Sequence, residues 1–432
     1  MILGEVWDAD PAADRSIIAC PRPNQVSSGP VDLAQLPPVP GLNADNLGRM
    51  VWCFGLKRID CNQHMWDIVD LPMKTATPSM QETLRILGTI LTLMRQANDD
   101  LPPMCLAWDL HLMHTLVNRA LLGLVHTQAL EIYPFWRDCQ VRPSEKLPFW
   151  RYSTIWYKGV HPVFGACDSD HNLKRVADHL YSGRRTVTVG GLPVDFCCML
   201  RGSIPPRAYT FEDMQSDKLR AQRLSATYMT GVWHDVGAHI MCYIVSLISS
   251  VWSSSLGTFS PEEMVLNAYT GYILLLLAVA HMEDKHGERW PDYFLPKITT
   301  LNMLDLAGHA IQRLIHFPAG APFHFRKTRE DSMEKWFART KSHCRGQPTY
   351  KDYMQGAFLT HIKQLHDKRN GLPGEPVPDL KAIPSDQAAR LASRAVDAAC
   401  TLHSVFTGLQ KPANVILADF QCWWSARGRR CL

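Results

Sequence analysis

Two short apolar runs, each ending at an aspartate, decide the fold class: Met104-Cys-Leu-Ala-Trp108-Asp109 and Pro162-Val-Phe-Gly-Ala-Cys167-Asp168. A run of about five apolar residues after a proline break predicts a short buried strand. Strands are rigid, so each run would hold its aspartate at a fixed place. An aspartate after a strand is also a common turn or helix-cap residue, and that is the alternative for Asp109.

The residues around these runs are mostly helical in pattern. Residues 78–98 are amphipathic, residues 210–316 are compatible with helix almost throughout, and residues 386–409 form a last helix after a linker rich in proline and glycine. Thr186–Val189, followed by two glycines, predicts a strand that enters a turn. The sequence therefore predicts a helix-rich α/β protein.

The composition is that of a globular protein with sizeable cores. The chain has 432 residues, of which 46% are hydrophobic and 20% charged, and its net charge is +4. Its 13 cysteines include no C-x-x-C pair, and an odd number scattered over a long chain is not a secreted disulfide framework. We expect reduced thiols and a cytosolic or nuclear protein.

Two apolar stretches, Ile240–Val251 and Tyr269–Ala280, raise the question of a membrane. Both are shorter than the roughly 18 residues that span a bilayer. The N-terminus is acidic where a secretory signal would be basic. We expect both stretches to be buried core helices and no membrane partner.

Two aspartates at strand ends suit the binding of divalent metal ions. Mg²⁺ prefers oxygen ligands from separate, rigid elements, and two-metal sites catalyse phosphoryl transfer. After the second strand the sequence reads Asp168-Ser-Asp-His171-Asn-Leu-Lys174-Arg175, in which His171, Lys174 and Arg175 would position a phosphate. The alternative for this block is a helix N-cap followed by a solvated basic face.

A third carboxylate, Glu334, lies in the most basic stretch of the chain. Its basic neighbours include Arg326, Lys327, Lys335, Arg339, Lys341 and Arg345, and the aromatic residues Phe323, Phe325, Trp336 and Phe337 are interleaved with them. Such a stretch favours contact with a DNA backbone. A solvated helix face is the alternative.

These three blocks resemble those of DDE-type transposases, most closely the P-element/THAP-associated group. Asp168, His171 and Lys174 match an Asp-x-x-His-x-x-Lys block at the second catalytic acid of that group. Glu334 and Phe337 match a later Glu-x-x-Phe block, which a basic residue and a glycine follow here at Lys341 and Gly346. Asp109 falls where the first acid stands, 59 residues before Asp168, and Met214–Leu224 is similar to an intervening helix of the group.

The resemblance implies an RNase H-like core interrupted by a large all-α insertion, because 166 residues separate Asp168 from Glu334. The expected order is a loop-rich arm (1–45), the first part of the core (46–200), the insertion (201–320), the completion of the core (321–369), and a linker with a C-terminal helix (370–432). It also implies Asp109, Asp168 and Glu334 as ligands of Mg²⁺ or Mn²⁺, DNA as partner, and a nuclear location, with the cytoplasm as alternative. A homo-oligomer is compatible with this function.

The sequence departs from the group in two ways. No Walker-type phosphate-binding motif occurs, and Cys61-Asn-Gln-His64 is only half of a zinc site. The chain is therefore expected to be either a truncated or domesticated transposase or one whose end-recognition element has no recognisable motif, and its enzymatic activity is open. Two alternatives remain: a non-catalytic transposase derivative that binds DNA or protein, and a helical structural or capsid-like protein.

Overall fold

The structure is a computed structural model, and it describes part of the chain residue by residue. The described residues are 50–56, 66–73, 80–97, 105–108, 119, 134–143, 147–167, 169–181, 187–194, 236–253, 259–317, 325, 336, 339–340, 342–343, 355–360, 362–363, 382–406 and 411–428. The chain divides into two compact units. The first comprises Met1–Thr83 and Glu330–Pro376, and the second comprises Leu84–Arg329 and Val377–Leu432.

The first unit contains a two-stranded antiparallel sheet. Strands β1 (Met50–Leu56) and β2 (Trp66–Met73) pair with Met50 opposite Met73. A helical segment at residues 355–360 buries Thr360, whose hydroxyl lies 3.3 Å from that of Thr340.

The second unit contains a four-stranded mixed sheet with the spatial order β3-β6-β5-β4. Its strands are β3 (Cys105–Trp108), β4 (Cys139–Pro143), β5 (Ser153–Tyr157) and β6 (His161–Cys167). Strands β4, β5 and β6 form an antiparallel meander, and β3 joins β6 in parallel. Both apolar runs that end at an aspartate are therefore strands, as predicted, and they are neighbours.

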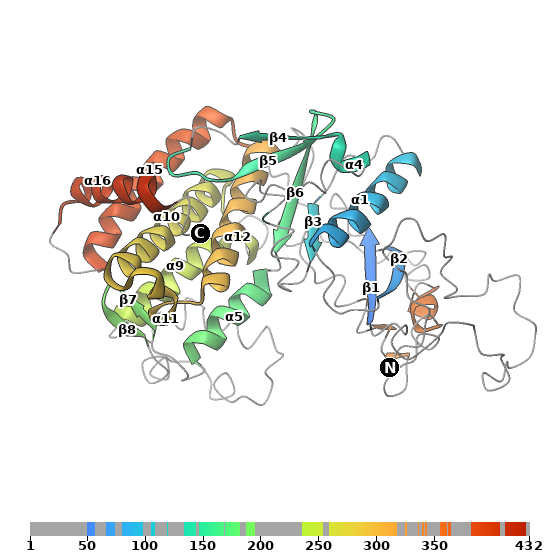
Figure 1. Cartoon of the computed structure of the whole chain (residues 1–432), viewed down its shortest axis with the longest axis horizontal. Helices are drawn as coiled ribbons and strands as arrows, with labels where there is room; N and C mark the ends of the chain where they lie inside the picture. Colours follow the sequence, from blue (N-terminus) through green and yellow to red (C-terminus); the bar gives the residue numbers. More distant parts are fainter. Residues whose placement is uncertain are drawn as a thin grey trace, which may run out of the picture. The chain divides into compact units, whose positions relative to one another are not determined.

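Helices make up most of the remaining described residues of the second unit (Figure 1). They are α1 (Met80–Ala97, which begins in the first unit), α4 (Pro134–Arg137), α5 (Ser169–Tyr181), α9 (Val236–Ser253), α10 (Pro261–His286), α11 (Trp290–Tyr293), α12 (Lys297–His316), α15 (Ser385–Phe406) and α16 (Ala413–Trp423). Short turns η6 (Gly287–Arg289) and η8 (Trp424–Gly428) follow α10 and α16. The prediction of a helix-rich α/β protein is confirmed at this level.

A hairpin of β7 (Val187–Val189) and β8 (Leu192–Val194) follows α5. Gly190 and Gly191 form its two-residue turn, with φ of 59° and 85°. Positive φ at both positions is the geometry of tight hairpin turns that favour glycine. The strand and turn predicted from Thr186 onward are therefore present.

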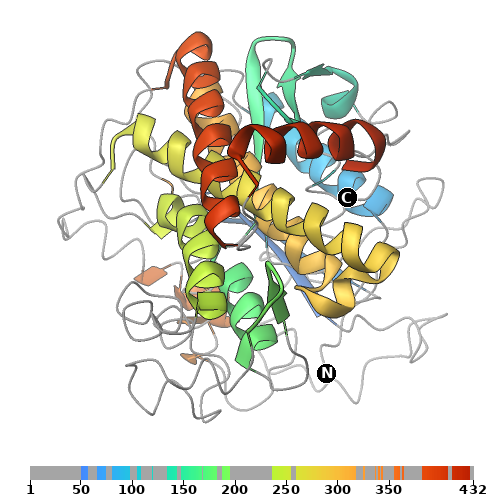
Figure 2. The same cartoon turned by 90° about the vertical axis from the view of Figure 1, so that its left-hand side faces the viewer.

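Helix α10 lies at the centre of the helical part and contacts α9, α12 and α15. Its start is set by Ser260, whose hydroxyl accepts from the Glu263 N–H at 3.2 Å while the Glu263 carboxylate accepts from the Ser260 N–H at 2.7 Å. This is a capping box with proline at the first helical position. Pro261 therefore begins a helix. Figure 2 shows α15 with α16 crossing it on the outer side of this part.

Both apolar stretches that raised the membrane question are largely buried. Ile240, Val251, Tyr269 and Val279 are each at most 1% exposed, which confirms the prediction of core helices. Among the described residues, the helical span Pro261–Tyr293 is long and apolar enough to cross a bilayer, and 78% of its most apolar window is buried inside the protein. Core helices of this length pass the same test.

Gly308 of α12 offers a direct test of this packing. A Cβ at Gly308 would lie 2.6 Å from Cε2 of Tyr152, at the entrance to β5. Gly308→Ala should therefore lower the free energy of unfolding by roughly 1–3 kcal/mol, even though alanine favours helix. Urea unfolding measures this, with Ser393→Ala on the exposed face of α15 as control. A stabilised Gly308→Ala protein would contradict the close packing of α12 on Tyr152.

Candidate functional site

The carboxyl ends of β3 and β6 lie side by side. In their parallel register Trp108 is opposite Cys167, and both residues are the last of their strands. Asp109 and Asp168 follow directly in the sequence. The two aspartates themselves lie outside the described residues, so the structure gives the placement of the strands and leaves that of the carboxylates as a prediction.

Helix α5 begins at Ser169, one residue after Asp168. It buries Leu173, Val176 and Leu180 on one face, and it contacts α9 and α12. His171, Lys174, Arg175 and Asp178, at helical spacing, make up the partly exposed face opposite. The three residues predicted to position a phosphate thus share one face of a helix whose N-terminus, which attracts anions, lies beside the strand end.

Helix α12 packs against the sheet and holds the backbone of two strands. The Gln312 amide donates to the Ser153 carbonyl of β5 at 2.9 Å, and the Arg313 guanidinium donates to the Gly165 carbonyl of β6 at 3.2 Å. Figure 1 shows α12 beside these strands. Arg313 is 0% exposed and lies 5.0 Å from the ring centre of Trp252, a cation–π contact.

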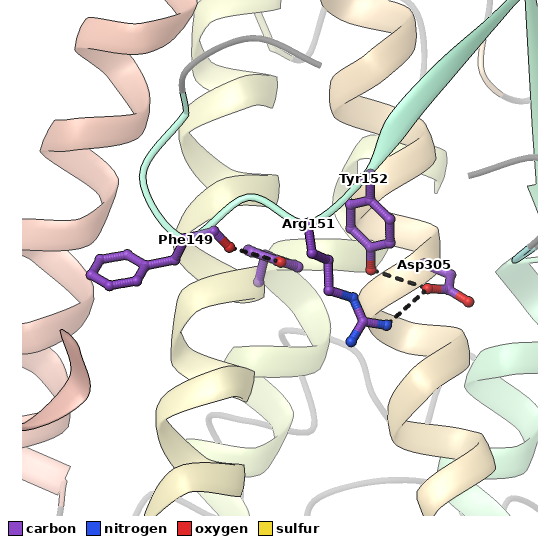
Figure 3. Close-up of polar contacts among 5 residues, drawn as sticks. Phe149, Arg151, Tyr152 and Asp305 are labelled. Carbon is purple, nitrogen blue, oxygen red and sulfur yellow. Dashed lines mark hydrogen bonds and ion pairs between the residues drawn. The ribbon is translucent and has the colours of Figure 1, made fainter. Parts of the chain in front are cut away.

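A fully buried acid on α12, Asp305, anchors the segment that leads into β5 (Figure 3). Its carboxylate accepts from the Tyr152 hydroxyl at 3.0 Å, and an Arg151 nitrogen lies 3.7 Å away. The second distance exceeds a hydrogen bond, so Arg151 acts through its charge. Burial raises the pKa of the Asp305 carboxyl, although the charges of Arg151 and Arg119 act in the opposite direction.

Residues 148–152, which lead into β5, also contact α10 and the C-terminal helix α16. The hydroxyls of Tyr269 and Tyr272 donate to the carbonyls of Pro148 and Phe149, the latter at 3.1 Å. The Phe149 ring, at a residue with φ of 56°, lies 4.5 Å from the ring of Phe420. This segment therefore connects the sheet to α10, α12 and α16 through named polar and aromatic contacts.

The predicted site residues are divided between described and undescribed parts of the chain. Those outside the described residues are Asp109, Asp168, Glu334, Arg326, Lys327, Lys335, Lys341 and Arg345. His171, Lys174, Arg175 and Arg339 are described, and all four are partly exposed. Among the described residues, no group of three histidine, cysteine, aspartate or glutamate side chains could hold a metal ion. The metal-binding prediction thus rests on Asp109, Asp168 and Glu334.

Two aromatic residues of the basic stretch are part of the core. Phe325 and Trp336 are each 1% exposed, and the Phe325 ring packs edge-on against Trp252 at 5.1 Å. Buried rings cannot stack on nucleic-acid bases. The interleaving of aromatic and basic residues therefore reflects folding at these two positions.

Sequence reasoning missed Asp305, Arg151 and Arg313. The signal was present in α12, where Asn302, Asp305, His309 and Arg313 recur at intervals of three or four residues within an otherwise apolar helix. All four are 0% exposed. Polar residues at helical spacing usually mark a solvated face, which is why this pattern was overlooked.

Comparisons with known proteins leave the family open. No protein-family model matches the chain, and no curated protein matches it. Among solved structures, the chain is similar to the Drosophila P element transposase strand transfer complex, with a TM-score of 0.46 and 12% identity. The similarity covers 69% of this chain and 67% of that one. Similarity at this level does not assign the chain to a family.

The raised pKa of Asp305 predicts a pH-dependent contribution to stability. A carboxyl whose pKa is higher in the folded state stabilises the fold below its unfolded pKa, and this stabilisation is lost as the pH rises through the folded pKa. The free energy of unfolding of the parent, minus that of Asp305→Asn, should therefore fall as the pH rises from about 4, a value near the ordinary pKa of aspartate. Urea unfolding at a series of pH values measures it.

Asp386→Asn is the matched control, since Asp386 is exposed and lies 3.3 Å from Arg390 on the same helix. This substitution should leave the pH dependence close to that of the parent. A difference between parent and Asp305→Asn that grows with pH would mean that attraction to Arg151 outweighs burial.

Proposed function

We propose that the chain is a transposase-like enzyme of nucleic-acid strand cleavage and transfer, with Asp109, Asp168 and Glu334 as its metal ligands. The observation that carries the proposal is the parallel register of β3 and β6, which pairs Trp108 with Cys167. An aspartate follows each of these residues. Open α/β sheets bind their ligands outside the carboxyl ends of their strands. The two aspartates, which directly follow β3 and β6, are expected at such a position.

The residues at this edge have the chemistry that the proposal needs. Carboxylates are the oxygen ligands that Mg²⁺ prefers. Bound Mg²⁺ or Mn²⁺ would stabilise the attacking and leaving oxygens of a phosphoryl transfer. His171, Lys174 and Arg175, on the partly exposed face of α5, would orient a phosphate at the same edge, together with the N-terminus of that helix.

DNA as partner and an RNase H-like arrangement of the core are further parts of the proposal. The strands β3 and β6 and the helix α5 that follows support it, since they bring two acids and a basic helix face to one edge of a sheet. A nuclear location follows from action on DNA and stays a prediction. The contribution of Glu334 comes from the sequence pattern.

Replacement of Asp168 tests the metal-binding role. Asp168→Asn keeps the size of the side chain and removes its charge, so Mg²⁺-dependent strand cleavage should fall by roughly 10³-fold, since the loss of a ligand costs several kcal/mol at the transition state. DNA affinity without metal should be unchanged or higher. Cleavage of labelled duplexes and a metal-free binding titration measure the two effects.

Asp178→Asn, two to three turns further along α5, is the control and should cut as the parent does. An Asp168→Asn protein with parental activity would show that Asp168 is only a cap. A parent that binds DNA and never cuts with Mg²⁺ or Mn²⁺ would favour the non-catalytic derivative. Assembly into large symmetric particles without DNA binding would favour the structural alternative.

The basic stretch predicts a salt-dependent, sequence-independent affinity. Replacing Lys335, Arg339 and Lys341 together by glutamine should weaken binding to all DNA sequences alike. It should also flatten the slope of log K against log salt by roughly 2–3, because each lost phosphate contact removes about 0.9 released counterions. Fluorescence anisotropy at several salt concentrations measures the slope.

A triple variant with the same change in net charge is the control. Arg289, Arg390 and Lys411 are exposed cations, each paired with an aspartate in the second unit. Their replacement by glutamine should leave the slope near that of the parent. Equal flattening in both triple variants would mean that only net charge matters, and that residues 335–341 are not a DNA contact.

A further inference from the structure

Strand β6 changes its partners along its length. Its first part, His161–Val163, pairs with Ile155–Tyr157 of β5, and its second part, Phe164–Cys167, pairs with β3. Ser153 at the start of β5 pairs with Pro143 of β4. The pairing of β6 with β5 therefore ends at Val163. The second part of β6, which leads to Asp168, begins at the next residue.

Helix α12 supplies donors at the point where the two strands part. Consecutive residues divide between the strands: Gln312 donates to the Ser153 carbonyl of β5, and Arg313 donates to the Gly165 carbonyl of β6. Gly165 belongs to the second part of β6. Arg313 thus binds the stretch of backbone that leads to Asp168, and Gln312 binds a strand that carries no predicted site residue.

The direction of α12 follows from three contacts with β5 and its entrance. His316 lies against Trp156, with ring centres 5.6 Å apart, Gln312 bonds to Ser153, and Gly308 faces Tyr152. The helix therefore runs parallel to β5 and antiparallel to β6. Toward its N-terminus, α12 therefore runs in the same direction as β6 does toward Asp168.

The side chain of Arg313 is itself held in place. It is 0% exposed, and its guanidinium lies over Trp252 of α9, whose indole N–H donates to the Leu306 carbonyl of α12 at 3.2 Å. A planar guanidinium fixed by packing offers a hydrogen bond of defined direction. The backbone of Gly165 is therefore held by α12, which α9 supports, in addition to its pairing with Leu106 of β3.

We propose that Arg313 is a positioning residue, which sets where the Asp168 end of β6 lies relative to the Asp109 end of β3. The inference rests on the proposed function. Gly165 precedes Asp168 by three residues, or about 10 Å of extended chain, so Arg313 acts through the backbone and touches no substrate. A metal site requires its ligands within about 0.5 Å of the productive geometry, so even a small shift of β6 would weaken metal binding.

The test compares two neighbouring residues in the full-length chain. Arg313→Met removes the donor to β6, and Gln312→Met removes the equivalent donor to β5. Arg313→Lys keeps the buried charge and provides a second variant if the methionine protein does not fold. The readouts are Mn²⁺ binding followed by electron paramagnetic resonance, Mg²⁺ dependence of cleavage, metal-free DNA affinity, and amide hydrogen exchange of peptides covering residues 161–168.

Arg313→Met should raise the Mn²⁺ and Mg²⁺ concentrations for half-saturation on the order of tenfold, as the loss of residues that orient metal ligands does. Arg313→Lys should show a smaller rise. Metal-free DNA affinity should stay at the parental value in both. Hydrogen exchange should quicken at 164–167 and not at 161–163. Gln312→Met should leave both metal dependences unchanged.

Equal effects of Arg313→Met and Gln312→Met, or parental metal dependence in both Arg313 variants, would overturn the inference. A parent that neither binds Mn²⁺ nor cuts would instead contradict the proposed function. Hydrogen exchange then decides the inference on its own: parental exchange at 164–167 in Arg313→Met would refute it, and selective quickening there would support the hold of Arg313 on β6.

Discussion

The buried contact of Asp305 with Tyr152 and Arg151 is the interaction on which the placement of the sheet depends. A carboxylate that is 0% exposed is costly unless hydrogen-bonded and paired, and here one hydroxyl bond and one guanidinium 3.7 Å away offset part of that cost. The penalty for separating them is high, because any movement of α12 away from the entrance to β5 would leave a charge buried alone. The register between helix and sheet is therefore fixed by a polar contact within an apolar core.

The consequences extend from this contact along α12. Two turns after Asp305, Gln312 and Arg313 reach the carbonyls of β5 and β6. Pro148 and Phe149, just before Arg151, are held by two tyrosine hydroxyls of α10 and by the ring of Phe420 on α16. The predicted site at the strand ends is thus supported by residues far away in sequence, since 153 residues separate Tyr152 from Asp305.

The sequence predicted those features that are local. The strands before Asp109 and Asp168, the glycine turn of β7 and β8, and the burial of α9 and α10 all follow from short apolar runs and breakers. That β3 and β6 lie side by side was expected only from the resemblance to the transposase group, which makes both aspartates ligands of the same metal ions, because pairing between residues almost 60 positions apart has no local signal. The roles of Asp305 and Arg313 were missed because polar residues at helical spacing usually mark a solvated face, whereas here they are buried. Phe325 and Trp336 were placed in a DNA-binding stretch because a buried ring and a stacking ring have the same sequence pattern.

The proposed function requires the parallel ends of β3 and β6 to hold Asp109 and Asp168 around shared metal ions. A crystal structure grown with Mn²⁺ and a short DNA duplex, with anomalous differences measured at the manganese edge, tests it most directly. We expect anomalous peaks at the carboxylates of both Asp109 and Asp168. Carboxylates directed away from each other, with any manganese bound elsewhere, would contradict it.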